Sequence, residues 1–124
     1  KQKAEMDYWT LPVTTLIKAA TLILTATGNS DGKNFLDLQT GDEFIIIPPG
    51  TGMEGAVFVA EKIREIIQDS AISTADDKTV KFTLSLGVAS HKKESGSFEE
   101  IISEADEMLY LSKKKGRNRV TACE

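Results

Sequence analysis

Thr40-Gly41-Asp42-Glu43-Phe44 lies between two apolar runs, Phe35 to Gln39 before it and Ile45 to Pro49 after it. Gly is a preferred turn residue, so the sequence predicts a hairpin over Phe35 to Pro48 with its turn at Thr40-Gly41. Two adjacent carboxylates follow that turn, and hard divalent cations such as Mg²⁺ prefer carboxylate oxygens. The local pattern therefore indicates either a metal site or an ordinary hairpin with a charged end.

The composition is that of a single globular domain. The chain has 124 residues, of which 40% are hydrophobic and 27% are charged, and this size suits one hydrophobic core. Its net charge of −4 argues against a nucleic-acid-binding surface. The apolar stretch Leu16 to Ala26 is too short to span a bilayer, and Lys18 interrupts it. The start of the chain has no signal-peptide layout, and the one cysteine, Cys123, has no internal partner for a disulfide. These features predict a cytoplasmic protein, or a cytoplasmic piece of one, without membrane contact by this segment.

Apolar periodicity predicts three helices. The first covers Thr14 to Thr27, and a turn-rich loop over Gly28 to Asn34 follows it. The second comes after Gly52 and precedes a polar loop over Asp69 to Lys78. Its predicted buried face consists of Ala56, Val59, Ala60, Ile63, Ile66 and Ile67.

Ser97 and Glu100 form a capping-box pattern at the start of the third helix, and Gly116 fits a cap after its end. Its predicted buried face consists of Phe98, Ile101, Ile102, Ala105, Met108 and Leu109. Before this helix, strict alternation from Val80 to Val88 predicts a strand with one core face, and Arg119 to Ala122 is predicted as a final short strand.

The resulting order of elements is helix, strand, strand, helix, strand, helix, strand. This order predicts an α+β fold with an antiparallel central sheet flanked by helices, close to the ferredoxin-like βαββαβ layout. That layout begins with a strand, and residues 1–13 do not supply one. We therefore interpret residues 1–13 as a linker and residues 14–124 as the domain.

Thr40-Gly41-Asp42-Glu43-Phe44 resembles the GGDEF signature of bacterial diguanylate cyclases, with one glycine missing. The resemblance extends over residues 35–121 and rests on several segments in the family's order and spacing. They are Ile45-Ile46-Ile47-Pro48, Glu54-Gly55-Ala56, Val59 to Arg64, Leu84 to Ala89, Ala105 to Tyr110 and Lys113 to Val120. It implies a GGDEF-like fold, related to the palm of nucleotide cyclases and polymerases. It also implies that two such domains meet face to face, each holding one GTP, and join the two GTP molecules into cyclic di-GMP.

The resemblance also implies roles for particular residues. Asp42 and Glu43 match the signature acids, which serve catalysis and bind Mg²⁺ or Mn²⁺, and the metal would stabilise charge on the attacked phosphate. Gly41 matches the glycine at which backbone approaches the nucleotide. Lys113 and Arg117 match the basic pair that contacts the GTP phosphates. Taken alone, those two residues also suit a helix C-terminus, where the helix dipole favours cations.

Several positions depart from the family pattern. Thr40 replaces a glycine at a turn position that β-branched residues resist. The family's first strand carries a metal-binding aspartate, and no such strand is visible in this sequence. Two alignments of the start remain open. Tyr8-Trp9 can match a tyrosine-glycine pair that follows the first strand, or Asp7 to Pro12 can match the opening of the family, with about forty residues then skipped.

The product-inhibition motif of the family, Arg-x-x-Asp, is also missing, because its window reads Asp31-Gly32-Lys33-Asn34. An acid cannot replace the bidentate grip of arginine, so no product-inhibition site is predicted. These departures leave two function classes. One is a diguanylate cyclase with impaired catalysis, which acts as a homodimer on GTP. The other is an inactive regulatory or dimerisation module, attached to sensor or receiver domains.

Overall fold

The first part of the chain forms a long antiparallel hairpin, which differs from the predicted helix. A computed structural model describes residues 13–28, 34–73, 75, 78–92 and 97–123. In it, strand β1 (Val13–Gly28) pairs with strand β2 (Asn34–Ile46). Eight of the 16 residues of β1 are Val, Ile or Thr, whose branched side chains favour extended backbone. The prediction of a helix over Thr14 to Thr27 was wrong because a strand that is apolar on both faces also matches helical spacing.

The signature pentapeptide lies inside β2, and the predicted turn at Thr40-Gly41 was wrong. Ala20 pairs with Glu43 and Leu22 pairs with Thr40, so that Gly41 and Asp42 together face the single residue Thr21. This two-against-one arrangement is a β-bulge, which accommodates an extra residue and increases the local twist. Because the backbone is extended here, the β-branched residue at position 40 suits the conformation.

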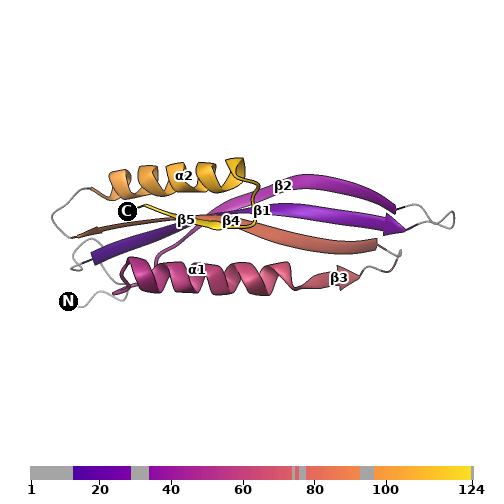
Figure 1. Cartoon of the computed structure of the whole chain (residues 1–124), viewed down its shortest axis with the longest axis horizontal. Coiled ribbons are helices and arrows are strands. Elements are labelled where there is room, and N and C mark those ends of the chain that lie inside the picture. Colours follow the sequence, from indigo (N-terminus) through magenta and orange to yellow (C-terminus); the bar gives the residue numbers. More distant parts are fainter. Residues whose placement is uncertain (1–12, 29–33, 74, 76–77, 93–96, 124) are drawn as a thin grey trace, which may run out of the picture.

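The remaining elements complete one mixed sheet with helices on both faces (Figure 1). The strand order is β2-β1-β4-β3, and β5 pairs in parallel with β4 beyond this path. Part of the segment predicted as a polar loop forms the short edge strand β3. The bounds are α1 Met53–Gln68, β3 Ala71–Ser73, β4 Lys78–Lys92, α2 Phe98–Lys114 and β5 Val120–Ala122.

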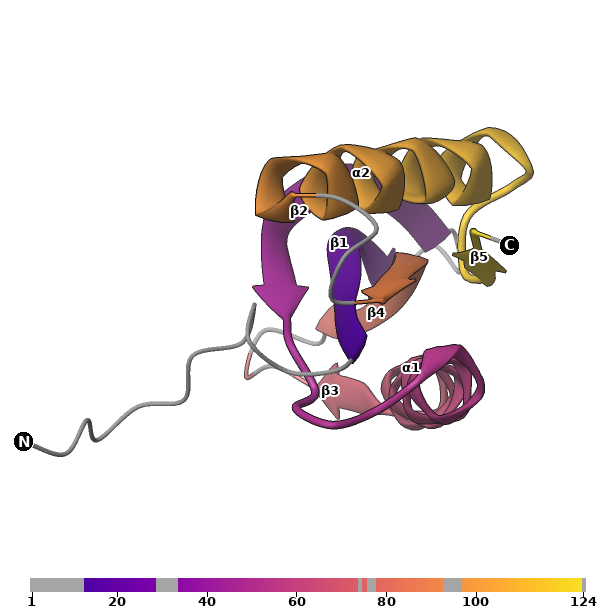
Figure 2. The same ribbon diagram turned by 90° about the vertical axis from the view of Figure 1, so that its left-hand side faces the viewer.

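The two helices pack on opposite faces of the sheet and create two core layers (Figure 2). Ile17 and Ala19 of β1 point towards α1, whereas Leu16 of the same strand points towards α2. This alternation explains why β1 is apolar along both faces. In α1 the predicted face was partly wrong, because Val59 and Ile66 are 37% and 64% exposed.

The third predicted helix is confirmed with its cap. The Ser97 hydroxyl accepts a hydrogen bond from the Glu100 amide, and the Glu100 carboxylate accepts one from the Ser97 amide. Gly116 follows the end of α2 with a φ of 120°, a conformation that glycine adopts without strain. The predicted α+β class is confirmed, although the described residues contain no crossover helix between β1 and β2.

Candidate functional site

Glu43 lies in a cluster of four charged side chains between the sheet and α2. Lys18 at the middle of β1 and Glu43 on β2 meet Asp106 and Lys113, which lie two turns apart on α2. The Lys18 Nζ atom is 2.7 Å from Asp106 Oδ1 and 3.7 Å from Glu43 Oε1. The Lys113 Nζ atom is 2.7 Å from the other Glu43 oxygen, Oε2. Both oxygens of Glu43 therefore have an ammonium group beside them.

These contacts shift two pKa values in the directions expected of ion pairs. The hydrogen bond from Lys113 lowers the pKa of Glu43 below its ordinary value of 4.5, and attraction to Lys113 and Lys18 adds to this effect against partial burial. The hydrogen bond to Asp106 raises the pKa of Lys18 above 10.5, with further attraction from Asp106 and Glu43. These shifts keep Glu43 and Lys18 charged at neutral pH, and the cluster pairs two acidic side chains with two basic ones.

Asp42 does not join this cluster. Adjacent side chains of a strand leave opposite faces of the sheet, and Glu43 takes the face that α2 covers. Asp42 is exposed, and its backbone carbonyl accepts a hydrogen bond from the Thr21 hydroxyl at 3.4 Å. The structure therefore does not bring together the two carboxylates that the sequence predicted as one metal site.

Gly41 has a packing role. A Cβ atom at this position would collide with the Thr21 hydroxyl across the bulge. A larger residue would therefore require the Thr21 side chain to turn away or β1 and β2 to move apart at this point. The neighbour that leaves little room for a side chain at position 41 is therefore strand β1. This packing role is independent of any contact between Gly41 and a nucleotide.

The two predicted phosphate contacts differ in their surroundings: Lys113 lies in the last turn of α2, and Arg117 follows the helix. Arg117 follows the helix in a left-handed conformation, with a φ of 66°. Its Nη1 atom is buried and has no hydrogen-bond partner within the described part of the chain. Lys113 instead donates to Glu43. Of the two residues, Arg117 is the one that presents an unsatisfied donor.

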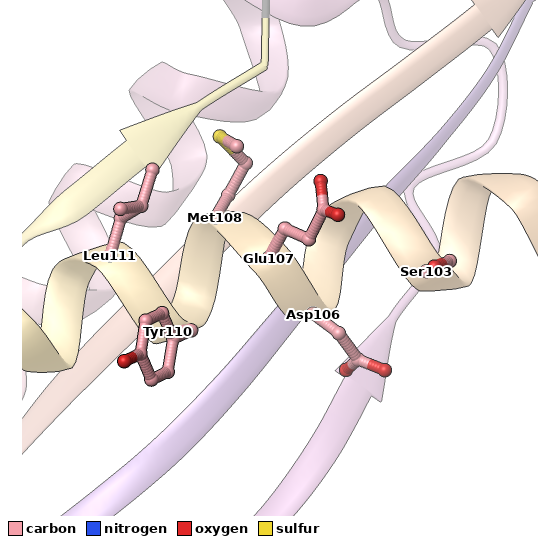
Figure 3. A pocket seen from close by; sticks show the side chains of 6 residues that line it. All are labelled: Ser103, Asp106, Glu107, Met108, Tyr110 and Leu111. Carbon is pink, nitrogen blue, oxygen red and sulfur yellow. The ribbon is translucent and has the colours of Figure 1, made fainter.

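A hollow of about 260 Å³ opens at the cluster, lined by Lys18, Glu43, Asp106, Leu109, Tyr110 and Lys113. A larger hollow of about 480 Å³ adjoins it along α2 and shares Asp106 and Tyr110. Figure 3 shows that Asp106 and Tyr110 project from one side of α2, whereas Met108 and Leu111 project from the other. Asp106 therefore stands at the boundary between the charged cluster and the exposed surface of α2.

Sequence reasoning missed Lys18 and Asp106 as members of the site. Lys18 is the single charged residue in β1, and it pairs with Ile45 on one side and Gly87 on the other. A lone lysine within a long apolar run signals a buried ionic partner, since an unpaired charge is costly there. The prediction of a helix for this segment hid the signal, because it did not show which elements would lie beside the Lys18 side chain.

The chain matches the family model described as "Diguanylate cyclase, GGDEF domain" over residues 14–119, and it belongs to this family. It is 41% identical to diguanylate cyclase A of Treponema denticola over 81 residues. These residues make up 65% of this chain and 22% of that protein. It is 38% identical to diguanylate cyclase DgcM of Escherichia coli over 82 residues, and these residues make up 66% of this chain and 19% of that protein. The chain thus spans about a fifth of the length of these curated relatives.

Solved structures agree on the fold. The GGDEF domain of DgcB from Caulobacter crescentus, solved in complex with c-di-GMP, superposes with a TM-score of 0.61 at 22% identity. That match covers 86% of this chain and 75% of the other. The active GGEEF domain of a diguanylate cyclase from Vibrio cholerae gives 0.59 at 21% identity, covering 86% and 83% of the two chains. Within the described ranges, neither helix is long and apolar enough to cross a membrane.

Diguanylate cyclases of this family generally use a divalent metal ion, but the residues of this site do not fit one. A dedicated site for a hard cation needs several oxygen ligands around one centre. Among the described residues, no three His, Cys, Asp or Glu side chains are placed to hold a metal ion. Glu43 is engaged by two ammonium groups, and the alternation of a strand directs the neighbouring Asp42 side chain away from the face of Glu43. We therefore derive no metal-dependent step for this chain.

Proposed function

We propose that this chain is a cyclic di-GMP signalling domain of the diguanylate cyclase family in which condensation of two GTP molecules is weak or absent. In this proposal it acts in the cytoplasm as a regulatory or dimerisation module, attached to sensor or receiver domains of a longer protein. Family membership supports the signalling role. The observation that carries the loss of turnover is the engagement of both Glu43 oxygens by Lys18 and Lys113.

The ion pairs make Glu43 a poor catalytic group. A carboxylate that acts on a metal ion or a proton must have a free oxygen at the reacting atoms. In this cluster a substrate or metal would first have to displace an ammonium group. Lys113, the predicted phosphate contact, is occupied by the same ion pair, so GTP and Glu43 would compete for it. These contacts predict weak GTP binding and little chemistry.

Nucleotide binding would depend mainly on the basic groups at the end of α2. The buried Nη1 atom of Arg117 has no partner among the described residues, and a phosphate oxygen would satisfy it once the guanidinium turned outward. We propose Arg117 as the principal phosphate contact and Lys113 as a second one that is released from Glu43 when phosphate binds. Gly41 would contribute by keeping β1 and β2 close together rather than by touching the nucleotide.

Turnover of labelled GTP tests this proposal. The concentrated chain, and the longer protein that contains it, would be incubated with Mg²⁺ or Mn²⁺, and the products would be separated by chromatography. We expect no cyclic di-GMP above a no-protein control, with an active diguanylate cyclase as the positive control. Cyclic di-GMP formed by a homodimer of the chain would contradict the proposal and show that Glu43 exchanges its lysine partners for metal during catalysis.

A further inference from the structure

We propose that the Lys18 ammonium group is a built-in cation, which holds the Glu43 and Asp106 carboxylates and keeps divalent metal ions away from them. The carboxylates come from β2 and α2, elements that are distant in the sequence. Both lie within 4 Å of the same nitrogen atom, at 3.7 and 2.7 Å. A single positive charge between two carboxylates takes the place that a metal ion would take.

Burial supports this assignment. The Lys18 side chain is only 15% exposed, whereas those of Glu43 and Asp106 are 45% and 49% exposed. The Lys18 side chain is therefore the most enclosed of the three, although its ion pair with Asp106 is itself exposed to solvent. A metal ion arriving from solvent would meet carboxylates that are already paired, and it would be repelled by Lys18 and Lys113 beside them.

The backbone of Lys18 is fixed on both sides. It pairs with Ile45 of β2 and with Gly87 of β4, so the residue lies in the interior of the sheet. Gly87 has no side chain, and α2 comes so close that a Cβ atom there would collide with the helix backbone at Ala105 and Leu109. This close approach fixes the distance between Lys18 and Asp106, the residue that follows Ala105 in α2. The ion pair is therefore a consequence of how α2 sits on the sheet.

The metal-excluding role of Lys18 would explain why turnover is impaired, and to that extent it rests on the proposed function. Its test, however, needs no nucleotide. Mn²⁺ would be titrated into the full chain at low ionic strength by calorimetry. We expect no saturable site below about millimolar Mn²⁺ in the wild type, since the described acids form no three-ligand group. Replacing Lys18→Gln removes the charge and keeps a polar chain of similar length, and it should tighten Mn²⁺ binding at least tenfold.

Two matched variants make the result specific. Lys81→Gln, at an exposed lysine of β4 outside the cluster, should bind Mn²⁺ as the wild type does. The double variant Lys18→Gln/Asp106→Asn should lose the gain, because one of the two facing carboxylates is gone. Circular dichroism would establish that each variant is folded, and Lys18→Met would replace Lys18→Gln if the latter were not.

The inference is overturned if Lys18→Gln gains no affinity, or if the double variant keeps the gain. A measurement on the wild type also decides it without any Lys18 variant. Should the wild type bind Mn²⁺ tightly and Glu43→Gln abolish that binding, Lys18 does not exclude metal. Turnover of GTP by the wild type would contradict the proposed function, whereas Mn²⁺ held by Glu43 in the wild type would overturn the role of Lys18, so the two failures are distinguishable.

Discussion

Replacing Gly87→Ala should lift α2 from the sheet and weaken both the fold and the charged cluster. Gly87 lies on β4 directly beneath α2. An added Cβ atom would lie 2.8 Å from the carbonyl carbon of Met108 and closer still to backbone atoms of Ala105 and Leu109. No rotamer change relieves these contacts, because every atom involved belongs to the helix backbone.

The magnitude follows from the size of the overlap. Carbon atoms in contact normally lie about 3.5–4.0 Å apart, so the helix would have to move by roughly 1 Å. Overpacking of this kind costs about 1–3 kcal/mol, and we expect the upper part of this range because the obstacle is backbone. For a domain of this size, such a loss lowers Tm by about 10 °C.

Thermal and urea denaturation followed by circular dichroism would measure the change. Gly55→Ala is the matched control, because its Cβ atom would meet only the methyl group of Thr51, at 2.9 Å, within a helix that alanine favours by about 1 kcal/mol over glycine. The control should lose much less stability than Gly87→Ala, because only the Thr51 methyl group has to move. If Gly87→Ala were as stable as the wild type, the close seating of α2 on β4 would be wrong.

Three further predictions concern single contacts. Ser112→Ala should lower the free energy of unfolding, measured by urea titration, by about 1–3 kcal/mol. The buried Ser112 hydroxyl donates to the Leu86 carbonyl at 2.8 Å and hydrogen-bonds the Thr121 hydroxyl at 2.7 Å. An unchanged urea midpoint would refute this role. Ser97→Ala should cost about 1 kcal/mol by the same assay through loss of the capping box, and no change would mean that solvent replaces the cap. Since the pKa of Glu43 is lowered in the folded state, its ion pairs stabilise the fold above pH 4.5 and this contribution is lost as pH falls below that value. Lys113→Met should make stability less dependent on pH in this range, and an equal dependence would show that Lys113 does not hold Glu43.

Much of the second half of the chain was predictable from sequence. The alternation of large apolar side chains in β4 and the capping box of α2 are local signals, which need no knowledge of the neighbouring elements. The prediction of one core face for β4 was wrong, however, because Ser85 and Ala89 are also buried and Ala89 packs in the layer beneath α2. The family resemblance added the fold class. The segments that carried it lie mainly in α1, β4 and α2, where the structure agrees with the predicted elements.

The first half was mispredicted because its local pattern was ambiguous. In β1 the side chains of Leu16 and Ile17 are both buried, on opposite faces of the sheet, so their spacing carried no period-two signal. The bulge at Gly41 depends on pairing with Thr21, twenty residues earlier, and no local rule reveals it. The same error concealed the charged cluster, since the position of Lys18 opposite Asp106 follows only from the sheet and the seating of α2.

The most direct test of the Lys18 cluster is a crystal structure of the chain soaked in Mn²⁺, with anomalous scattering used to locate the metal. We expect the Lys18 ammonium to lie between Glu43 and Asp106, and no anomalous peak to lie within coordination distance of Glu43. An Mn²⁺ ion bound jointly by Asp42 and Glu43, with Lys18 turned away, would contradict this expectation.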